Sequence, residues 1–185
     1  MNRDEAWRLL TEYTRTDSLL KHALAVEAAM RHYARLGGHD EHAWGLVGLL
    51  HDFDYERWPE PPDHTRQGAE ILRRAGLAEE SVSAILSHAQ WNHDEYPLDR
   101  PIRKTLFAVD ELCGFLVAVA LVRPDRLVGL EPPSVRKKMK DKRFAASVSR
   151  EDIIRGAELL EMDLNRHIAH CIAALQPVAC DLGLA

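Results

Sequence analysis

The feature that most constrains this chain is a short apolar run that ends in a histidine and an aspartate. Residues 46–50 are all apolar or glycine, His51 and Asp52 follow directly, and a proline-rich loop comes next. A buried imidazole beside a buried carboxylate is costly unless something pairs with both groups. A divalent cation is one such partner, so we expect other parts of the chain to bring further ligands to this point.

Composition narrows the class of protein. The 185 residues are 46% hydrophobic and 29% charged, which is ordinary for a globular domain with a sizeable core. A net charge of -5 gives no general attraction to nucleic acids or anionic membranes. The three cysteines form no close pair, and neither a signal peptide nor a membrane span is evident. These features predict a cytoplasmic protein without nucleic-acid or membrane partners.

Helix signals run along the whole chain. Capping residues, glycine stops and apolar residues at spacings of three and four recur, whereas no alternation typical of strands is found. The expected helices cover about residues 3–14, 17–37, 40–50, 64–75, 79–88 and 101–123, with two more starting after residues 149 and 163. The sequence therefore predicts an all-α single domain, a helical bundle that spans residues 1–185.

Several side chains of metal-binding type have helical positions that could point inward. His22 lies on the apolar stripe of its helix, and Asp110 is flanked by apolar residues at helical spacing. A lone histidine on such a stripe is more often a core residue, but a set of six favours a metal site. Nitrogen and oxygen ligands together suit transition metals better than Ca. The six candidate ligands are His22, His51, Asp52, His64, His88 and Asp110.

The order of these residues resembles that of the HD superfamily of metal-dependent phosphohydrolases. Its H…HD…D signature is matched, in order, by His22, His51, Asp52 and Asp110. His64 and His88 are similar to the two extra histidines of the two-metal members, and Gly68 completes a His-x-x-x-Gly motif. The resemblance spans about residues 18–120.

The resemblance implies an HD-type bundle in which residues 18–120 hold the metal site and residues 124–185 complete the fold. One ion would be bound by the residues of the H…HD…D signature, and Asp52 would bridge to a second ion held by His64 and His88. Many two-metal members have another histidine where this chain has Ala89, so one or two ions remain open. The expected cofactor is a divalent metal among Mn, Fe, Co, Ni, Zn and Mg.

The implied function is a metal-dependent phosphohydrolase, a phosphomonoesterase or phosphodiesterase, that acts on a small phosphate ester or nucleotide. A metal-bound hydroxide would attack phosphorus. Asp52 is a predicted catalytic residue, and Asp54 or Glu56 could orient the water or protonate the leaving group. Asp54 and Glu56 are equally consistent with solvated loop residues.

A basic run occupies residues 136–143, where six of eight side chains are lysine or arginine. It could hold a small phosphorylated substrate near the metal, with His93 at the entrance, or it could be a solvated charged face. No aromatic platform for nucleic acid accompanies it. The predicted substrate-binding residues are His93, Arg136, Lys137, Lys138 and Lys140.

Two other functions fit the same motifs. A minority of HD proteins are di-iron oxygenases, which would bind iron tightly and consume oxygen. A non-catalytic regulatory HD module is the second alternative, although a scaffold gains nothing from unpaired buried charges. The sequence leaves the oligomeric state open.

Overall fold

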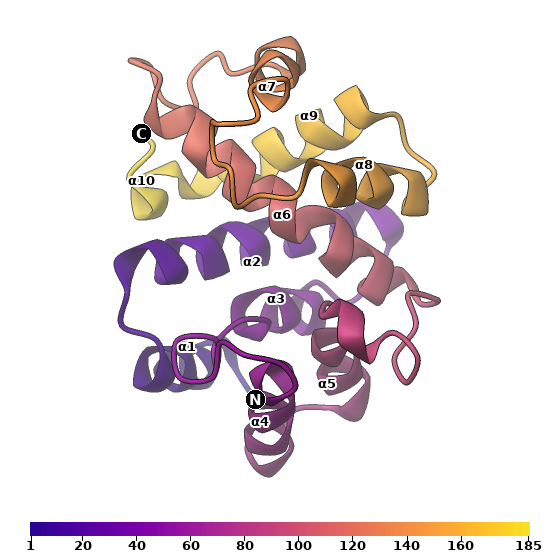
Figure 1. Cartoon of the computed structure of the whole chain (residues 1–185). Coiled ribbons are helices and arrows are strands. Elements are labelled where there is room, and N and C mark those ends of the chain that lie inside the picture. Colours follow the sequence, from indigo (N-terminus) through magenta and orange to yellow (C-terminus); the bar gives the residue numbers. More distant parts are fainter.

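The computed structural model describes residues 1–185 and consists of helices, with no strand (Figure 1). Helix α2 crosses the middle of the molecule, between α1, α3, α4 and α5 on one side and α6 to α10 on the other. The bounds are α1 Arg3–Tyr13, α2 Asp17–Gly37, α3 Glu41–Leu50, α4 Asp63–Arg74, α5 Glu79–Leu86, α6 Pro101–Leu121, α7 Pro132–Met139, α8 Arg150–Leu159, α9 Leu164–Leu175 and α10 Ala179–Leu182. The prediction of an all-α single domain is confirmed.

Most helix ends lie where the local sequence predicts them. Asn2 forms a capping box at the start of α1, and Asp40, Ser149 and Asp163 cap α3, α8 and α9 through their side chains. Helix α2 ends at Gly38, which adopts the left-handed conformation that glycine tolerates best. Four elements were not predicted: the 3-10 turns Gln90–Asn92 and Gln176–Val178, α7 and α10.

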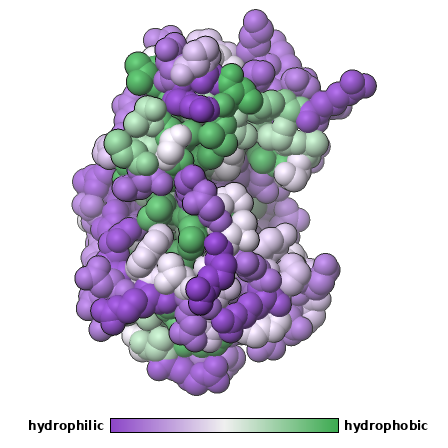
Figure 2. Space-filling view, turned by 90° about the vertical axis from the view of Figure 1, so that its left-hand side faces the viewer, coloured by the Kyte–Doolittle hydropathy of each residue, from purple (hydrophilic) through white to green (hydrophobic).

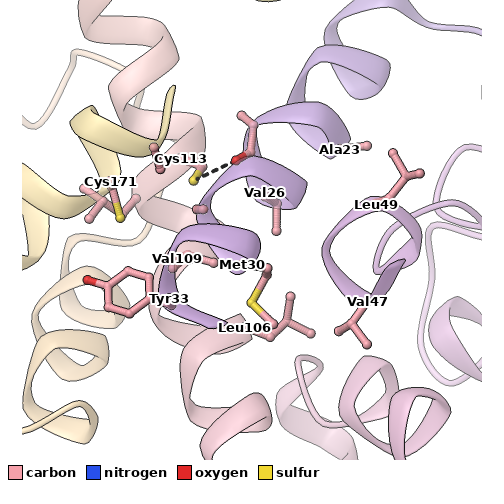
Figure 3. Packing of buried hydrophobic residues seen from close by; sticks show 14 of the residues in the cluster. Ala23, Val26, Met30, Tyr33, Val47, Leu49, Leu106, Val109, Cys113 and Cys171 are labelled. Carbon is pink, nitrogen blue, oxygen red and sulfur yellow. Dashed lines mark hydrogen bonds between the residues drawn. The ribbon is translucent and has the colours of Figure 1, made fainter. Parts of the chain in front are cut away.

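The core is organised around α2, which packs against α3, α6 and α9 (Figure 3). Val26 and Met30 of α2 are fully buried between Leu49 of α3 and Val109 of α6. Burying side chains of this size is worth about 1.5–3 kcal/mol each. This packing fixes α2, α3 and α6 relative to one another, and each of these helices positions a candidate metal ligand.

The approach of α3 to α2 depends on Gly48. A methyl group there would lie 2.8 Å from the carbonyl oxygen of Val26 and 2.9 Å from Cα of Glu27, both backbone atoms. We expect Gly48→Ala to lower stability by about 1–3 kcal/mol, because α3 must move away from α2. Thermal unfolding followed by circular dichroism should show a midpoint lower by several degrees.

Gly114→Ala on α6 is the matched control. A methyl group at Gly114 would meet only the His22 ring, at 3.8 and 3.9 Å, which is ordinary van der Waals contact. Alanine favours a helix over glycine by up to about 1 kcal/mol, so the control should be neutral or stabilising. Equal midpoints for both variants would contradict the close α2–α3 approach.

No helix combines the length and the apolar character that crossing a membrane requires. Figure 2 shows the face at the left of Figure 1, where apolar residues gather on the upper part and hydrophilic residues cover most of the rest. Leu121, Val122 and Val128 are 50%, 57% and 69% exposed, respectively. These three exposed apolar side chains lie at the end of α6 and in the loop that follows it.

Candidate metal centre

A first group of ligand atoms comes from α2, α6 and the end of α3. His22 Nε2 lies 3.2 Å from His51 Nε2 and 3.0 Å from Asp110 Oδ1. His51 Nε2 lies 3.5 Å from Asp110 Oδ1 and 3.6 Å from Asp52 Oδ2. Three helices that are distant in the sequence therefore place four predicted ligands around one point.

A second group shares Asp52 with the first. His64 Nε2, at the start of α4, lies 3.3 Å from Asp52 Oδ1. His88 Nε2, just after α5, lies 3.1 Å from the same oxygen. Asp52 thus directs Oδ2 toward the first group and Oδ1 toward the second, which is the arrangement of a bridging carboxylate.

The outer nitrogen of three of the histidines is already engaged. The Nδ1 atoms of His51 and His88 donate to the carbonyl oxygens of Gly48 and Ile85, at 2.8 and 2.6 Å. Nδ1 of His64 lies 3.0 Å from Asp54 Oδ1, to which it donates. A carbonyl or a carboxylate can only accept, so when each ring is neutral its Nδ1 carries the hydrogen and its Nε2 carries the lone pair, directed at the group. Such outer contacts are typical of metal-binding histidines.

The charges in the two groups are strongly coupled. Burial disfavours a charged His51, but the carboxylates of Asp52 and Asp110 outweigh burial and raise its pKa to about 9. Burial likewise opposes a charged His64, yet Asp52 and Asp54 raise its pKa to about 9. Burial would raise the pKa of Asp52 and of Asp110, but the adjacent histidines hold both below the usual range. Without an ion, protons therefore balance the two carboxylates.

The donor set fits divalent metal ions. Two ligand atoms that share one ion at about 2.1 Å lie about 3 Å apart when their bonds meet at a right angle. The contacts around Asp52 and Asp110, from 3.0 to 3.6 Å, match that spacing. Four imidazoles and two carboxylates suit transition metals. Either group, His22 with His51 and Asp52 or Asp52 with His64 and His88, could hold an ion.

Asp54 has a different role from the one predicted. Its side chain is 1% exposed, and Oδ1 accepts from His64 Nδ1. Oδ2 accepts from the backbone amides of Thr65 and Gly68, both at 2.9 Å. Both oxygens are therefore engaged, and Asp54 positions His64 rather than orienting water in the cleft.

The same carboxylate explains the glycine of the His-x-x-x-Gly motif. A methyl group at Gly68 would lie 2.6 Å from Asp54 Oδ2 and 2.9 Å from Phe53 Cε1. Thr65 has a positive φ of 69°, a conformation that costs a β-branched residue energy. The hydrogen bonds from its amide to Asp54 and from Asn92 Nδ2 to its Oγ1 hold it in place. The start of α4 is thus built around Asp54 to aim His64.

We expect Asp54→Asn to weaken the second group selectively. The amide cannot accept from Nδ1 of His64 and from two backbone amides as the carboxylate does, so the imidazole loses its fixed orientation. Affinity for an ion at His64 and His88 should fall by about 10–100-fold. Metal titration by calorimetry should show a weaker second event and an unchanged first one. Asp94→Asn, an exposed change in the loop after His93, is the control.

The two groups open into a cleft of about 520 Å³. Its walls come from α6, α8, the loop before α8 and the 3-10 turn after His88. Beyond the ligands, the lining residues are Tyr55, Ala89, Gln90, Trp91, Phe107, Glu111, Gly114, Ser147, Val148 and Asp152. Burial and the neighbouring Asp110 raise the pKa of Glu111 to about 7.

Two other predicted residues do not reach this cleft. Glu56 is exposed, and its Oε2 accepts from the backbone amides of Arg15 and Thr16 at 2.7 and 3.1 Å. Glu56 therefore ties the start of α2 to the loop after Asp52, a position that favours the alternative of a solvated loop residue over the predicted catalytic role. His93 Nε2 lies 3.0 Å from the carbonyl oxygen of Ser87, so this ring stabilises the loop and is not part of the cleft wall.

The basic run is also outside the cleft. Its residues lie on and just beyond α7, which packs against α9 and α6 at the upper edge of Figure 1. Arg136 lies 3.5 Å from Asn165 of α9, and the Lys138 ammonium lies over the ring of Phe144. None of Arg136, Lys137, Lys138 and Lys140 lines the cleft, so their position favours the alternative of a solvated charged face over the predicted substrate-binding role.

The walls contain residues that the sequence did not single out. Glu111 follows Asp110 on α6, but an adjacent residue on a helix gives no sign that both reach one cleft. Asp152 stands three residues after the cap Ser149, a position that explains it fully as part of a helix start. Gln90 and Phe107 carry no distinguishing pattern.

Comparison with known proteins agrees with this geometry. The family model of the HD domain matches residues 19–126, which covers more than half of the chain and contains all six candidate ligands. Neither the curated proteins nor the solved structures include a match to the chain. By the extent of the match and the order of its ligands, the chain belongs to the HD-domain family.

Proposed function

We propose that this protein is a metal-dependent phosphohydrolase that cleaves a small phosphate ester. The observation that supports this most is the shared carboxylate: Asp52 faces His22 and His51 with one oxygen, and His64 and His88 with the other. Two adjacent cation sites suit phosphoryl transfer because they can neutralise both the attacking and the leaving oxygen. In the reaction, the oxygen of water bonds to phosphorus and the alcohol leaves with a proton.

The residues of the chain contribute position and charge. His51, His64 and His88 are each held in one tautomer, so their lone pairs need no reorganisation to bind. Asp110 closes the first group from α6, and Asp52 joins the two groups. When bound, divalent ions would supply a water of lowered pKa and neutralise the phosphoryl oxygens.

The test uses the protein purified without chelator and reloaded with Mn, Co, Ni or Mg. Release of phosphate or alcohol should be detected for at least one substrate in a panel of phosphomonoesters and phosphodiesters, and a chelator should abolish it. A silent panel with metal bound would contradict the proposal. Iron-loaded protein that consumes oxygen would instead indicate the di-iron oxygenase alternative.

Elemental analysis tests the third alternative, the non-catalytic regulatory module. A non-catalytic module would carry no ion, and Asp110→Ala would then change neither its metal content nor its stability. We also propose a location. The three free cysteines are consistent with a reducing compartment such as the cytoplasm.

A further inference from the structure

The cleft contains no basic residue. Apart from the histidines of the metal groups, the charged residues that line it are aspartates and glutamates, and no lysine or arginine is among the lining residues. Enzymes that bind polyanions usually contact them with lysine or arginine. The charge of one phosphoryl group can be met by the metal end of the cleft, but a second anionic group on the substrate would have no partner there.

Two carboxyl groups beyond the metal ligands face this cleft instead. Glu111 extends from α6, and its Oε2 accepts from the backbone amide of Ser149 at 2.9 Å, while Oε1 has no hydrogen-bond partner. Asp152 lies in the first turn of α8, where Gln90 Nε2 lies 3.5 Å from both of its carboxylate oxygens. Each group therefore retains acceptor capacity for a ligand.

Two exposed aromatic rings line the same cleft, next to His64. Tyr55 and Trp91 are 41% and 46% exposed, and their rings stand edge-on to His64 at 5.2 and 5.9 Å. Phe107 of α6 also lines the cleft, but it is 6% exposed and the Arg155 guanidinium lies 5.1 Å from its ring centroid, so the two exposed rings are those of Tyr55 and Trp91. Exposed aromatic faces next to carboxylates are a recurrent environment for ammonium groups. The rings are a second feature, independent of the acids, that favours a cationic ligand.

We propose that the substrate is the phosphomonoester of an amino alcohol, with its phosphoryl group at the metal end and its ammonium group between Asp152, Glu111 and the aromatic rings. This inference rests on the proposed phosphohydrolase function. It narrows the substrate class: esters with a second phosphate or a carboxylate, including nucleoside polyphosphates, are disfavoured by repulsion from the acids.

A binding experiment tests this charge preference without requiring turnover. Three phosphonates of equal chain length differ only in the terminal group: 3-aminopropylphosphonate, propylphosphonate and 3-phosphonopropionate. Their dissociation constants for the metal-loaded protein are measured by calorimetry. The amine should bind about tenfold or more tightly than the carboxylate, with the neutral compound between them.

Two isosteric variants locate the preference. Asp152→Asn and Glu111→Gln should each reduce the ratio of amine to carboxylate affinity several-fold, while the affinity for propylphosphonate stays within about twofold. Glu151→Gln is the matched control, because Glu151 is the exposed neighbour of Asp152 on α8 and does not line the cleft. A ratio that is unchanged in both variants would contradict the assigned residues.

Hydrolysis of phosphoethanolamine, 2-hydroxyethyl phosphate and 2-phosphoglycolate separates the two proposals. If the phosphonates bind in the expected order but no ester is cleaved, the phosphohydrolase function is wrong and the charge preference stands. If the carboxylates bind or react as well as the amines, or if none of the phosphonates binds, the inference is overturned.

Discussion

Asp52→Asn is expected to abolish hydrolysis and to remove bound metal from both groups. Asp52 is the one residue that belongs to both groups: Oδ2 lies near His51 of the first group, and Oδ1 lies near His64 and His88 of the second. Asparagine keeps the shape but has one acceptor oxygen and no charge, so it cannot bridge. Loss of an outer contact to a metal ligand costs about 10–100-fold in affinity or activity, and loss of the bridge should exceed that range.

The measurements are metal content by elemental analysis and kcat/KM for the best substrate of the panel. Asp94→Asn serves as the control, because it makes the same chemical change in an exposed loop residue. Helix content by circular dichroism should be unchanged in both variants, since Asp52 contributes no core packing. Retained metal together with retained activity in Asp52→Asn would show that the two groups do not act as one centre.

That the six candidate ligands come together could be predicted from the sequence, because the inward direction of each side chain depends on local pattern. His22 and Asp110 lie on apolar helix stripes, and the apolar run before His51 ends at the core. Helical periodicity turns such residues inward wherever the helices pack on one another. The order of the ligands along the chain then indicated the fold that brings them together.

The walls of the cleft could not be predicted, because they depend on how distant helices cross. Helix α8 lies so close to α6 that a methyl group at Gly156 would be 2.6 Å from Cα of Ala108. This approach brings Asp152 to the same cleft as Glu111. The place of the basic run could not be predicted for a related reason: α7 packs on α9, and no local signal shows which surface a charged helix will face.

Asp54 illustrates a signal that was present but unread. Its position just after the His51–Asp52 pair suggested chemistry, whereas its side chain folds back under the start of α4. Gly68, in the first turns of α4, was the indication: a glycine inside a helix is costly unless something approaches closely, and here the carboxylate of Asp54 does.

Removing the metal is expected to make the stability of the protein fall steeply as pH rises from about 6.5 to 9.5. The pKa values of His51 and His64 are each raised to about 9 in the metal-free fold, from about 6.5 in an unfolded chain. Between these values the folded state binds more protons than the unfolded state, so deprotonation destabilises it. Each histidine contributes up to about 3 kcal/mol below pH 6.5, which is lost above pH 9.

Thermal unfolding of chelator-treated protein should therefore show a midpoint lower by about 10–20 °C at pH 9.5 than at pH 6.5. Metal-loaded protein should show little change, because bound imidazoles are neutral and the ions replace the protons as partners of Asp52 and Asp110. The affinity for each ion should rise with pH over the same range, by up to about tenfold per pH unit, since one proton must leave each group: that of His51 in the first and that of His64 in the second.

His64→Gln isolates one of the two contributions. In the metal-free variant, the fall in the unfolding midpoint between pH 6.5 and pH 9.5 should be about half as large. The reason is that only His51 still loses a proton in the folded state over this range. His42→Gln is the control: His42 is exposed on α3, and its Nε2 contacts only the carbonyl oxygen of Met1. The opposite result would be a metal-free protein whose unfolding midpoint stays constant or rises toward pH 9.5. It would mean that protons do not balance the carboxylates of Asp52 and Asp110 in the metal-free fold. The two groups would then lack the negative charge that a cation site requires.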